Sequence, residues 1–124
     1  MRTKSLIAGL AGLAALALAL VGCGGDDAPA VTGDGTSVEI VAGDMFYEPE
    51  NVSANAGTIE ITLINEGAAE HNLLVEEVGD VLVVHTDPGE TATGTIDLEP
   101  GTYTIYCDIP GHRASGMEGT LTVN

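Results

Sequence analysis

The chain is arranged around a stretch near its C-terminal end that reads TYTIYCDIPGHRASGM, residues 102–117. The first part of this stretch has Tyr103, Ile105 and Cys107 at every second position. Successive side chains of a β-strand point to opposite faces, so these three residues are expected to point the same way. The pattern predicts a strand that ends by placing Cys107 at the end of an inward-facing row.

The second part of the stretch is a loop that carries three metal-binding side chains. His112 and Met117 follow Cys107 at equal intervals, with Pro110 and Gly111 between the first two. Thiolate, imidazole and thioether ligands together favour copper, and a Cys with two His and a weak axial Met is the ligand set of a blue-copper site. A lone Cys or Met usually packs in the core, but this combination on one short loop is hard to obtain by chance. The loop therefore predicts a copper site that needs a second histidine from elsewhere.

Two other histidines, His71 and His85, could complete this ligand set. His71 follows a Gly-Ala-Ala loop and precedes the apolar residues Leu73 and Val75, which would anchor it at the start of a strand. The segment between His71 and Cys107 has room for about three short strands with their turns, so it can return the chain to the same end of a sandwich. His85 lies beside an Asp-Pro-Gly turn, where a surface position is the more ordinary interpretation. We predict His71 as the ligand and keep His85 as the alternative.

The rest of the domain is a series of short alternating segments separated by turn residues. These segments are 37–42, 58–65, 71–76, 81–85, 91–98, 102–107 and 118–123. Strict alternation indicates strands with one buried face, and many short strands between turns indicate a β-sandwich or barrel. We interpret the segment 46–52 as a bend in which Phe46, the only Phe of the chain, fills the core. Outside the N-terminal segment, no stretch has the length and periodicity of a good helix.

Several residues near the predicted ligands have supporting roles in this interpretation. Asn72 follows His71 directly, and its amide could hydrogen-bond to the ligand loop and orient it. An ordinary Asn at a strand edge is the alternative. Pro110 lacks a backbone donor and stiffens the loop. Asp108 and Arg113 are expected to be solvated surface charges.

The first residues are typical of an exported segment. Basic Arg2 and Lys4 precede an apolar run at 6–21, and a small residue followed by Cys23 closes it. These are features of a signal peptide. The sequence Leu-Val-Gly-Cys at 20–23 resembles the lipobox of bacterial and archaeal lipoproteins, which implies that Cys23 becomes a lipid-carrying N-terminus. The alternatives are an uncleaved membrane anchor or a plain secretory signal with Cys23 as a free thiol, and each of these still exports the domain.

These features divide the chain into a signal peptide at 1–22, a flexible tether at 23–36 and one domain at 37–124. The tether is rich in Gly, Pro and acidic residues and has almost nothing to bury. The domain is long enough for a single modest core. Once Cys23 carries lipid, Cys107 is the only thiol left, so no disulfide can form within the chain. Metal ligation is a physical reason to keep such a thiol, because a bound metal holds it as the thiolate.

The charge of the chain is strongly negative. It has 19 Asp and Glu residues against three Lys and Arg, with a formal net charge of −16. Two of the three basic residues lie in the predicted signal peptide, which leaves Arg113 alone in the exported part. Phosphate binding requires Lys and Arg, so nucleic-acid binding is excluded. The acidity either steers a basic partner toward the protein or reflects adaptation to salt, and the sequence leaves both open.

The pair His71-Asn72, the loop 107–112 and the segment 117–121 resemble the cupredoxins, the blue-copper family that includes plastocyanin and auracyanin. The similarity covers about residues 37–124, although plastocyanin itself has a shorter step from Cys to His. The resemblance implies a Greek-key β-sandwich with one type 1 copper at one end. It implies these ligands: His71, Cys107, His112 and Met117. It also implies that His112 shows an edge to solvent and passes the electron, beside a docking patch of Ile109, Pro110 and Ala114.

The function expected on this basis is one-electron transfer through Cu(I) and Cu(II), without enzymatic activity. We expect a monomer that exchanges electrons with redox partner proteins and is anchored by lipid to the periplasmic or outer surface of the cell membrane. The alternative within copper biology is an extracytoplasmic copper carrier or storage protein, but such proteins tend to use exposed sites rich in Met or Cys. A copper oxidase or nitrite reductase would need further histidines, and only His85 is left. A metal-free adhesion sandwich would leave the loop unexplained.

Overall fold

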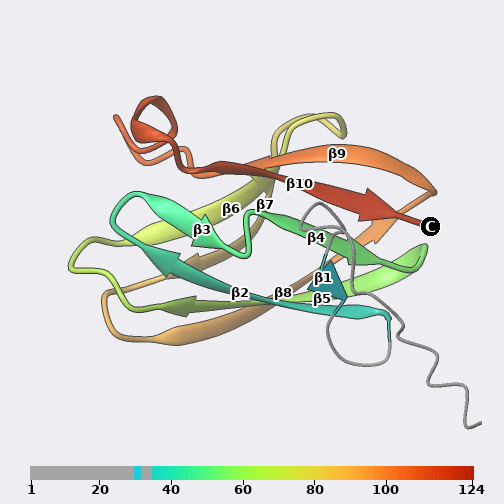
Figure 1. Cartoon of the computed structure of the whole chain (residues 1–124), viewed down its shortest axis with the longest axis horizontal. Helices are drawn as coiled ribbons and strands as arrows, with labels where there is room; N and C mark the ends of the chain where they lie inside the picture. Colours follow the sequence, from blue (N-terminus) through green and yellow to red (C-terminus); the bar gives the residue numbers. More distant parts are fainter. Residues whose placement is uncertain (1–29, 32–34) are drawn as a thin grey trace, which may run out of the picture.

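The computed structural model describes residues 30–31 and 35–124, which form two facing β-sheets (Figure 1). The strands are β1 (Ala30–Val31), β2 (Ser37–Gly43), β3 (Phe46–Glu48), β4 (Asn51–Ala54), β5 (Gly57–Asn65), β6 (His71–Val75), β7 (Val81–Thr86), β8 (Thr91–Leu98), β9 (Gly101–Tyr106) and β10 (Glu118–Val123). Within the described residues the helical structure is limited to one 3₁₀ turn, η1 (Arg113–Ser115), and no helix there is long and apolar enough to cross a membrane. The predicted β-sandwich is confirmed.

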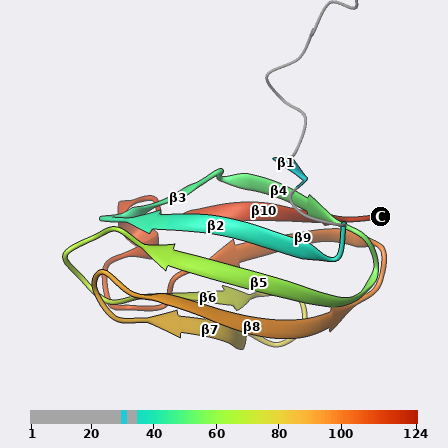
Figure 2. The same cartoon turned by 90° about the horizontal axis from the view of Figure 1, so that it is seen from below.

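The strand order brings the two ends of the predicted site together. One sheet has the order β1-β4-β10-β9-β6-β7, and the other has the order β3-β2-β5-β8. In Figure 2, β2, β5 and β8 run side by side across the molecule. β6 lies antiparallel to β9, with Leu74 opposite Tyr106. The start of β6 therefore lies beside the end of β9, as the return of the chain between His71 and Cys107 requires.

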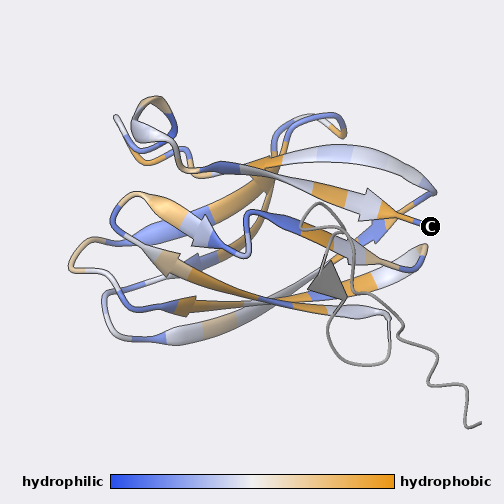
Figure 3. Ribbon diagram, viewed as in Figure 1, coloured by the Kyte–Doolittle hydropathy of each residue, from blue (hydrophilic) through white to orange (hydrophobic). Residues whose placement is uncertain are grey.

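The core lies between the sheets and is made from the alternating apolar residues of the strands. Figure 3 shows the hydrophobic and hydrophilic residues interleaved along the strands. The fully buried aliphatic side chains, each at most 1% exposed, are Val38, Ile40, Val52, Ile59, Ile61, Leu63, Leu73, Val75, Ile105 and Leu121. Burial of such side chains contributes roughly 1.5–3 kcal/mol each. These buried side chains stabilise the packing of the two sheets, and the packed sheets hold the ends of the strands in place.

The segment 46–52 is a bend only at residues 49 and 50, and not throughout as the sequence indicated. It forms the short strands β3 and β4, and Phe46 is 47% exposed instead of filling the core. Tyr47 is buried in its place, 3% exposed. Phe46 lies opposite Gly43 in the ladder between β2 and β3, and a Cβ on Gly43 would come within 2.2 Å of the Phe46 ring. The ring therefore covers the bare backbone of Gly43 on the outer face.

Part of the segment predicted as a tether is ordered against the domain. β1 pairs in parallel with β4, and Gly35 accepts a backbone hydrogen bond from Asn55. The predicted signal peptide and Cys23 both lie outside the described residues. The boundaries at 1–22, 23–36 and 37–124 stay predictions.

Candidate metal centre

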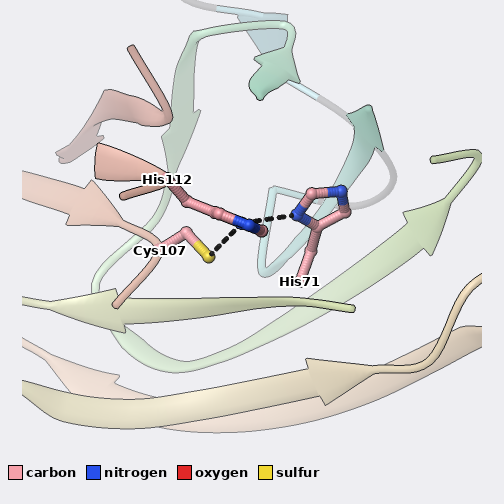
Figure 4. A group of neighbouring side chains, drawn as sticks. All are labelled: His71, Cys107 and His112. Atoms are coloured by element: carbon pink, nitrogen blue, oxygen red, sulfur yellow. Dashed lines mark hydrogen bonds between the residues drawn. The ribbon is translucent and has the colours of Figure 1, made fainter. Parts of the chain in front are cut away.

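Three buried donor side chains meet where β6 begins and β9 ends (Figure 4). His71 is the first residue of β6, Cys107 directly follows β9, and His112 lies in the loop after it. His71 and Cys107 are completely buried, and His112 is 6% exposed. Their donor atoms all lie within 4.8 Å of one another. The structure therefore brings together the three strong ligands that the sequence suggested.

The spacing of these donors suits one bound ion. Nδ1 of His71 lies 3.2 Å from Nδ1 of His112, and Sγ of Cys107 lies 3.5 Å from that same His112 nitrogen. Ligands about 2.0–2.3 Å from a tetrahedral metal lie roughly 3.3–3.6 Å from each other. The distances, together with a donor set of two imidazoles and one thiol, fit a copper ion.

Met117 is held beside Cys107 by the backbone of the loop. Its amide donates to the His112 carbonyl at 3.1 Å, and its carbonyl accepts from the Cys107 amide at 3.2 Å. Its side chain is completely buried in the core. Gly116, at φ +112°, ends η1 in the left-handed conformation, which allows the chain to turn back toward Cys107. A thioether is the weak axial ligand of a type 1 copper site, and Met117 is the residue of this loop that could supply it.

Comparisons with known proteins agree with this geometry. Residues 12–123 match the family model described as a cupredoxin-like domain. The chain belongs to the cupredoxin-like family. It is 30% identical over 115 residues to plastocyanin from Ulva prolifera, which covers 85% of this chain and 98% of the plastocyanin.

Solved cupredoxin structures resemble this one over most of its length. Reduced auracyanin from Roseiflexus castenholzii is 27% identical, with a TM-score of 0.61 over 74% of this chain and 99% of the auracyanin. Auracyanin B, at 22% identity, shares the fold with a TM-score of 0.63, over 76% of this chain and 94% of its own. The family membership and the cupredoxin fold expected from the sequence are confirmed.

The alternative histidine of this cupredoxin lies away from the buried donors. His85 on β7 is exposed, and its Nε2 lies 3.3 Å from Oε2 of Glu70. It groups with Glu70 and Asp87 on the surface. Because Cys107 and His112 lie with His71 instead, the structure favours the choice of His71.

Asn72 joins β6 to the ligand loop by two hydrogen bonds. Its Nδ2 donates to Oδ1 of Asp108 at 2.6 Å, and its Oδ1 accepts from the Asp108 amide at 3.0 Å. Its carbonyl also accepts from the buried Tyr47 hydroxyl at 2.5 Å. These contacts fit the orienting role expected for Asn72. Asp108 is exposed, as expected for a surface charge, but its carboxylate also accepts a hydrogen bond from Asn72.

Burial keeps the Cys107 thiol protonated in the absence of metal. Removal of the side chain from water raises its pKa, and backbone hydrogen bonds from Asn72 and Ile109 lower it only in part. A buried thiolate is costly without a positive partner. A metal ion that binds Cys107 as the thiolate would therefore displace a proton, and its affinity would rise with pH.

Asp44 contacts His71, although no sequence pattern singles it out. It follows β2, and its Oδ1 lies 2.9 Å from Nε2 of His71. The Ala68 and Ala69 amides donate to its carboxylate at 2.8 and 3.3 Å. The hydrogen bond from Ala68, followed by that from His71, lowers the pKa of Asp44. Asp44 follows β2 of one sheet and His71 begins β6 of the other, so the contact depends on how the two sheets pack and no local pattern reveals it.

Arg113 is not the solvated charge that the sequence suggested. Its Nε donates to Glu118 at 2.5 Å, and its two terminal nitrogens lie 3.1 Å from Oε1 of Glu76. The guanidinium also lies 4.1 Å from the centre of the Tyr106 ring. These carboxylates raise the pKa of Arg113 further. Arg113 directly follows His112, and its ion pairs thus connect the ligand loop to Glu118 in β10 and to Glu76 after β6.

Replacing Arg113 with alanine should loosen this fastening. Two half-exposed ion pairs and one cation–π contact contribute together about 1–2 kcal/mol, so the free energy of unfolding should fall by that amount in urea titrations. Arg113→Lys keeps the charge but loses the planar guanidinium, and we expect its free energy of unfolding to lie between those of the wild type and Arg113→Ala. Equal stability of all three proteins would show that these contacts contribute nothing.

Proposed function

We propose that this cupredoxin carries electrons one at a time through a type 1 copper site. The observation that supports the proposal most strongly is the convergence of two imidazole nitrogens and a thiol, all buried, at 3.2 and 3.5 Å. Bound copper supplies a one-electron couple between Cu(I) and Cu(II). The proposed ligands are His71, Cys107, His112 and Met117, for one copper ion per domain.

The role of the protein is to hold these ligands in one arrangement. His71 is fixed by β6, and Cys107 is fixed by the end of β9 and by its backbone bond to Met117. Ligands that are already positioned need to move little between the two oxidation states, which keeps the barrier to electron transfer low. Their burial also disfavours the alternative of a carrier or storage protein, because release of copper would require the loop to open.

Electron exchange requires a surface where a partner approaches the site. A hollow of about 500 Å³ lies against the ligand loop, and its lining includes Cys107, Ile109, Pro110 and Ala114. We assign this hollow as the docking surface for redox partner proteins. Its lining is mostly apolar but also includes Asp108 and Arg113, so a partner would meet an apolar surface bordered by these two charges. His112, a proposed ligand on this loop, is only 6% exposed, so little of the expected solvent-facing edge is accessible. Its ring would be the route by which an electron passes between the copper and this surface.

The place of action proposed is the outside of the cell membrane, with the domain held by lipid on Cys23. The support for this part is the sequence alone, namely the apolar run and the Leu-Val-Gly-Cys motif at 20–23. The segment between Cys23 and β2 would then act as the tether.

A copper titration of residues 23–124 followed by optical, EPR and electrochemical measurements tests the electron-transfer proposal. One equivalent of Cu(II) should give intense visible absorption and the narrow hyperfine splitting of a copper–thiolate site. Voltammetry should then show a reversible one-electron wave. A colourless Cu(II) complex, or loss of copper on each reduction, would contradict the proposal.

A further inference from the structure

Asp44 lies behind His71, on the side opposite to the other donors. His71 belongs to the six-stranded sheet, whereas Asp44 follows β2 of the four-stranded sheet. The His71 ring lies between Asp44 and His112. Its Nε2 is 2.9 Å from Oδ1 of Asp44, and its Nδ1 is 3.2 Å from Nδ1 of His112. A histidine that binds metal through one nitrogen commonly donates its other N–H to an oxygen acceptor, which fixes the tautomer.

The carboxylate of Asp44 is itself held in place. Oδ2 accepts from the Ala68 amide at 2.8 Å, and Oδ1 accepts from the Ala69 amide at 3.3 Å as well as from His71. These amides belong to the loop that leads into His71. These three contacts fix the orientation of the carboxylate relative to the His71 ring. Asp44 therefore connects β2, the loop and the ligand through fixed contacts.

The loop passes so close over this pair that only glycine fits at one position. A Cβ on Gly67 would lie 2.3 Å from Oδ1 of Asp44 and 2.8 Å from Nε2 of His71. Gly67 also donates its amide to Oδ1 of Asn65 at 2.9 Å, which fixes the loop above the pair. The contact between Asp44 and His71 is thus enclosed by the backbone on one side, although 38% of the Asp44 side chain remains exposed.

We propose that Asp44 is a positioning residue of the copper centre, which holds His71 with its proton on Nε2 and its Nδ1 lone pair toward the metal. Its negative charge, transmitted through the imidazole, favours Cu(II) over Cu(I) and lowers the reduction potential. Only the claim about the reduction potential, the second half of the inference, rests on the proposed copper function. The first half concerns the metal-free protein, because the tautomer is set before copper arrives.

Two variants separate the hydrogen bond from the charge. Asp44→Ala removes both, whereas Asp44→Asn keeps an oxygen that accepts from Nε2 of His71 and removes only the charge. Glu66→Gln is the matched control, because Glu66 is an exposed acid on the same loop and its side chain makes none of the contacts described above. Each protein is compared with the wild type in the same form, residues 23–124.

The tautomer is measured in the metal-free proteins by long-range ¹H–¹⁵N NMR of the histidine rings. Wild type, Asp44→Asn and Glu66→Gln should show His71 with the proton on Nε2, and Asp44→Ala should show a mixture. Competition titrations should show a loss of Cu(II) affinity of about 10- to 100-fold in Asp44→Ala. The reduction potential should rise in Asp44→Asn and stay unchanged in Glu66→Gln.

The outcomes distinguish failure of this inference from failure of the copper function. If the wild type forms the coloured copper site but Asp44→Ala keeps its tautomer, affinity and potential, Asp44 has no positioning role. If Asp44→Ala fails to fold, equal potentials in the wild type and Asp44→Asn still overturn the effect of the charge. If the wild type forms no coloured site, the proposed function fails, and a mixed His71 tautomer in Asp44→Ala alone still supports the positioning half.

Discussion

Replacing Cys107 with serine should abolish the intense visible absorption of the Cu(II) protein. The absorption of a type 1 site depends on the thiolate, and a serine hydroxyl neither ionises near neutral pH nor offers copper a soft ligand. Cys107 is completely buried, and serine is close to it in size, so the fold should survive. The affinity for copper should fall by more than the roughly 10- to 100-fold typical of changes behind the ligands.

His85→Ala is the matched control for this experiment. His85 is exposed and contacts Glu70 instead of the buried donors, so its removal should leave both the absorption and the EPR spectrum unchanged. Loss of colour in this variant would identify His85 as the ligand in place of His71. Colour that persists in Cys107→Ser would place the chromophore elsewhere in the molecule.

Replacing Gly94 with alanine should produce the largest loss of stability among single changes of this size. Gly94 lies in β8, and a Cβ there would come within 1.9 Å of the backbone oxygen of Val83 in β7. A backbone oxygen cannot rotate away as a side chain can, so the two strands must separate. Overpacking of this kind costs about 2–3 kcal/mol, which corresponds to a fall in Tm of roughly 10–20 °C for a domain of this length.

Gly101→Ala provides the comparison, because it adds the same methyl group at the first residue of β9. The nearest atoms there belong to the Tyr103 ring, at 3.5 Å and beyond, which is ordinary contact. Its free energy of unfolding should change by about 0.5 kcal/mol or less. Thermal unfolding followed by circular dichroism measures both variants. Equal melting temperatures of Gly94→Ala and Gly101→Ala would mean that β7 and β8 separate without loss of stability.

Most of the fold could be predicted because the strands carry their pattern locally. In β5 the buried residues Ile59, Ile61 and Leu63 alternate with more exposed ones, and β8 has the same regularity. This alternation is a property of neighbouring residues, so it is visible before the sheets form. The segment at 46–52 differs because its strands are too short to show a period. The outward position of Phe46 depends on the bare backbone of Gly43, which lies opposite it only after β2 and β3 pair.

The candidate site was predicted to the extent that its residues lie on one loop. Cys107, His112 and Met117 share a short stretch, and their chemistry is visible in the sequence. His71 required an argument about the return of the chain, which the pairing of β6 with β9 supports. Asp44 could not be found, because its contact with His71 depends on the packing of one sheet against the other. The ion pairs of Arg113 with Glu76 and Glu118 likewise form only in the folded molecule.

The strongly negative net charge of the chain affects how two copies of this protein meet. Arg113 is the only Lys or Arg among the described residues, and its charge is turned toward Glu76 and Glu118 of its own molecule. The described residues therefore offer little unpaired positive charge, and two molecules of strongly negative net charge repel each other. Electron self-exchange should be slow in dilute buffer and accelerate as salt shortens the Debye length to about 10 Å at 0.1 M. At low ionic strength the mutual repulsion therefore keeps the copper sites of two molecules apart, and added salt allows them to approach.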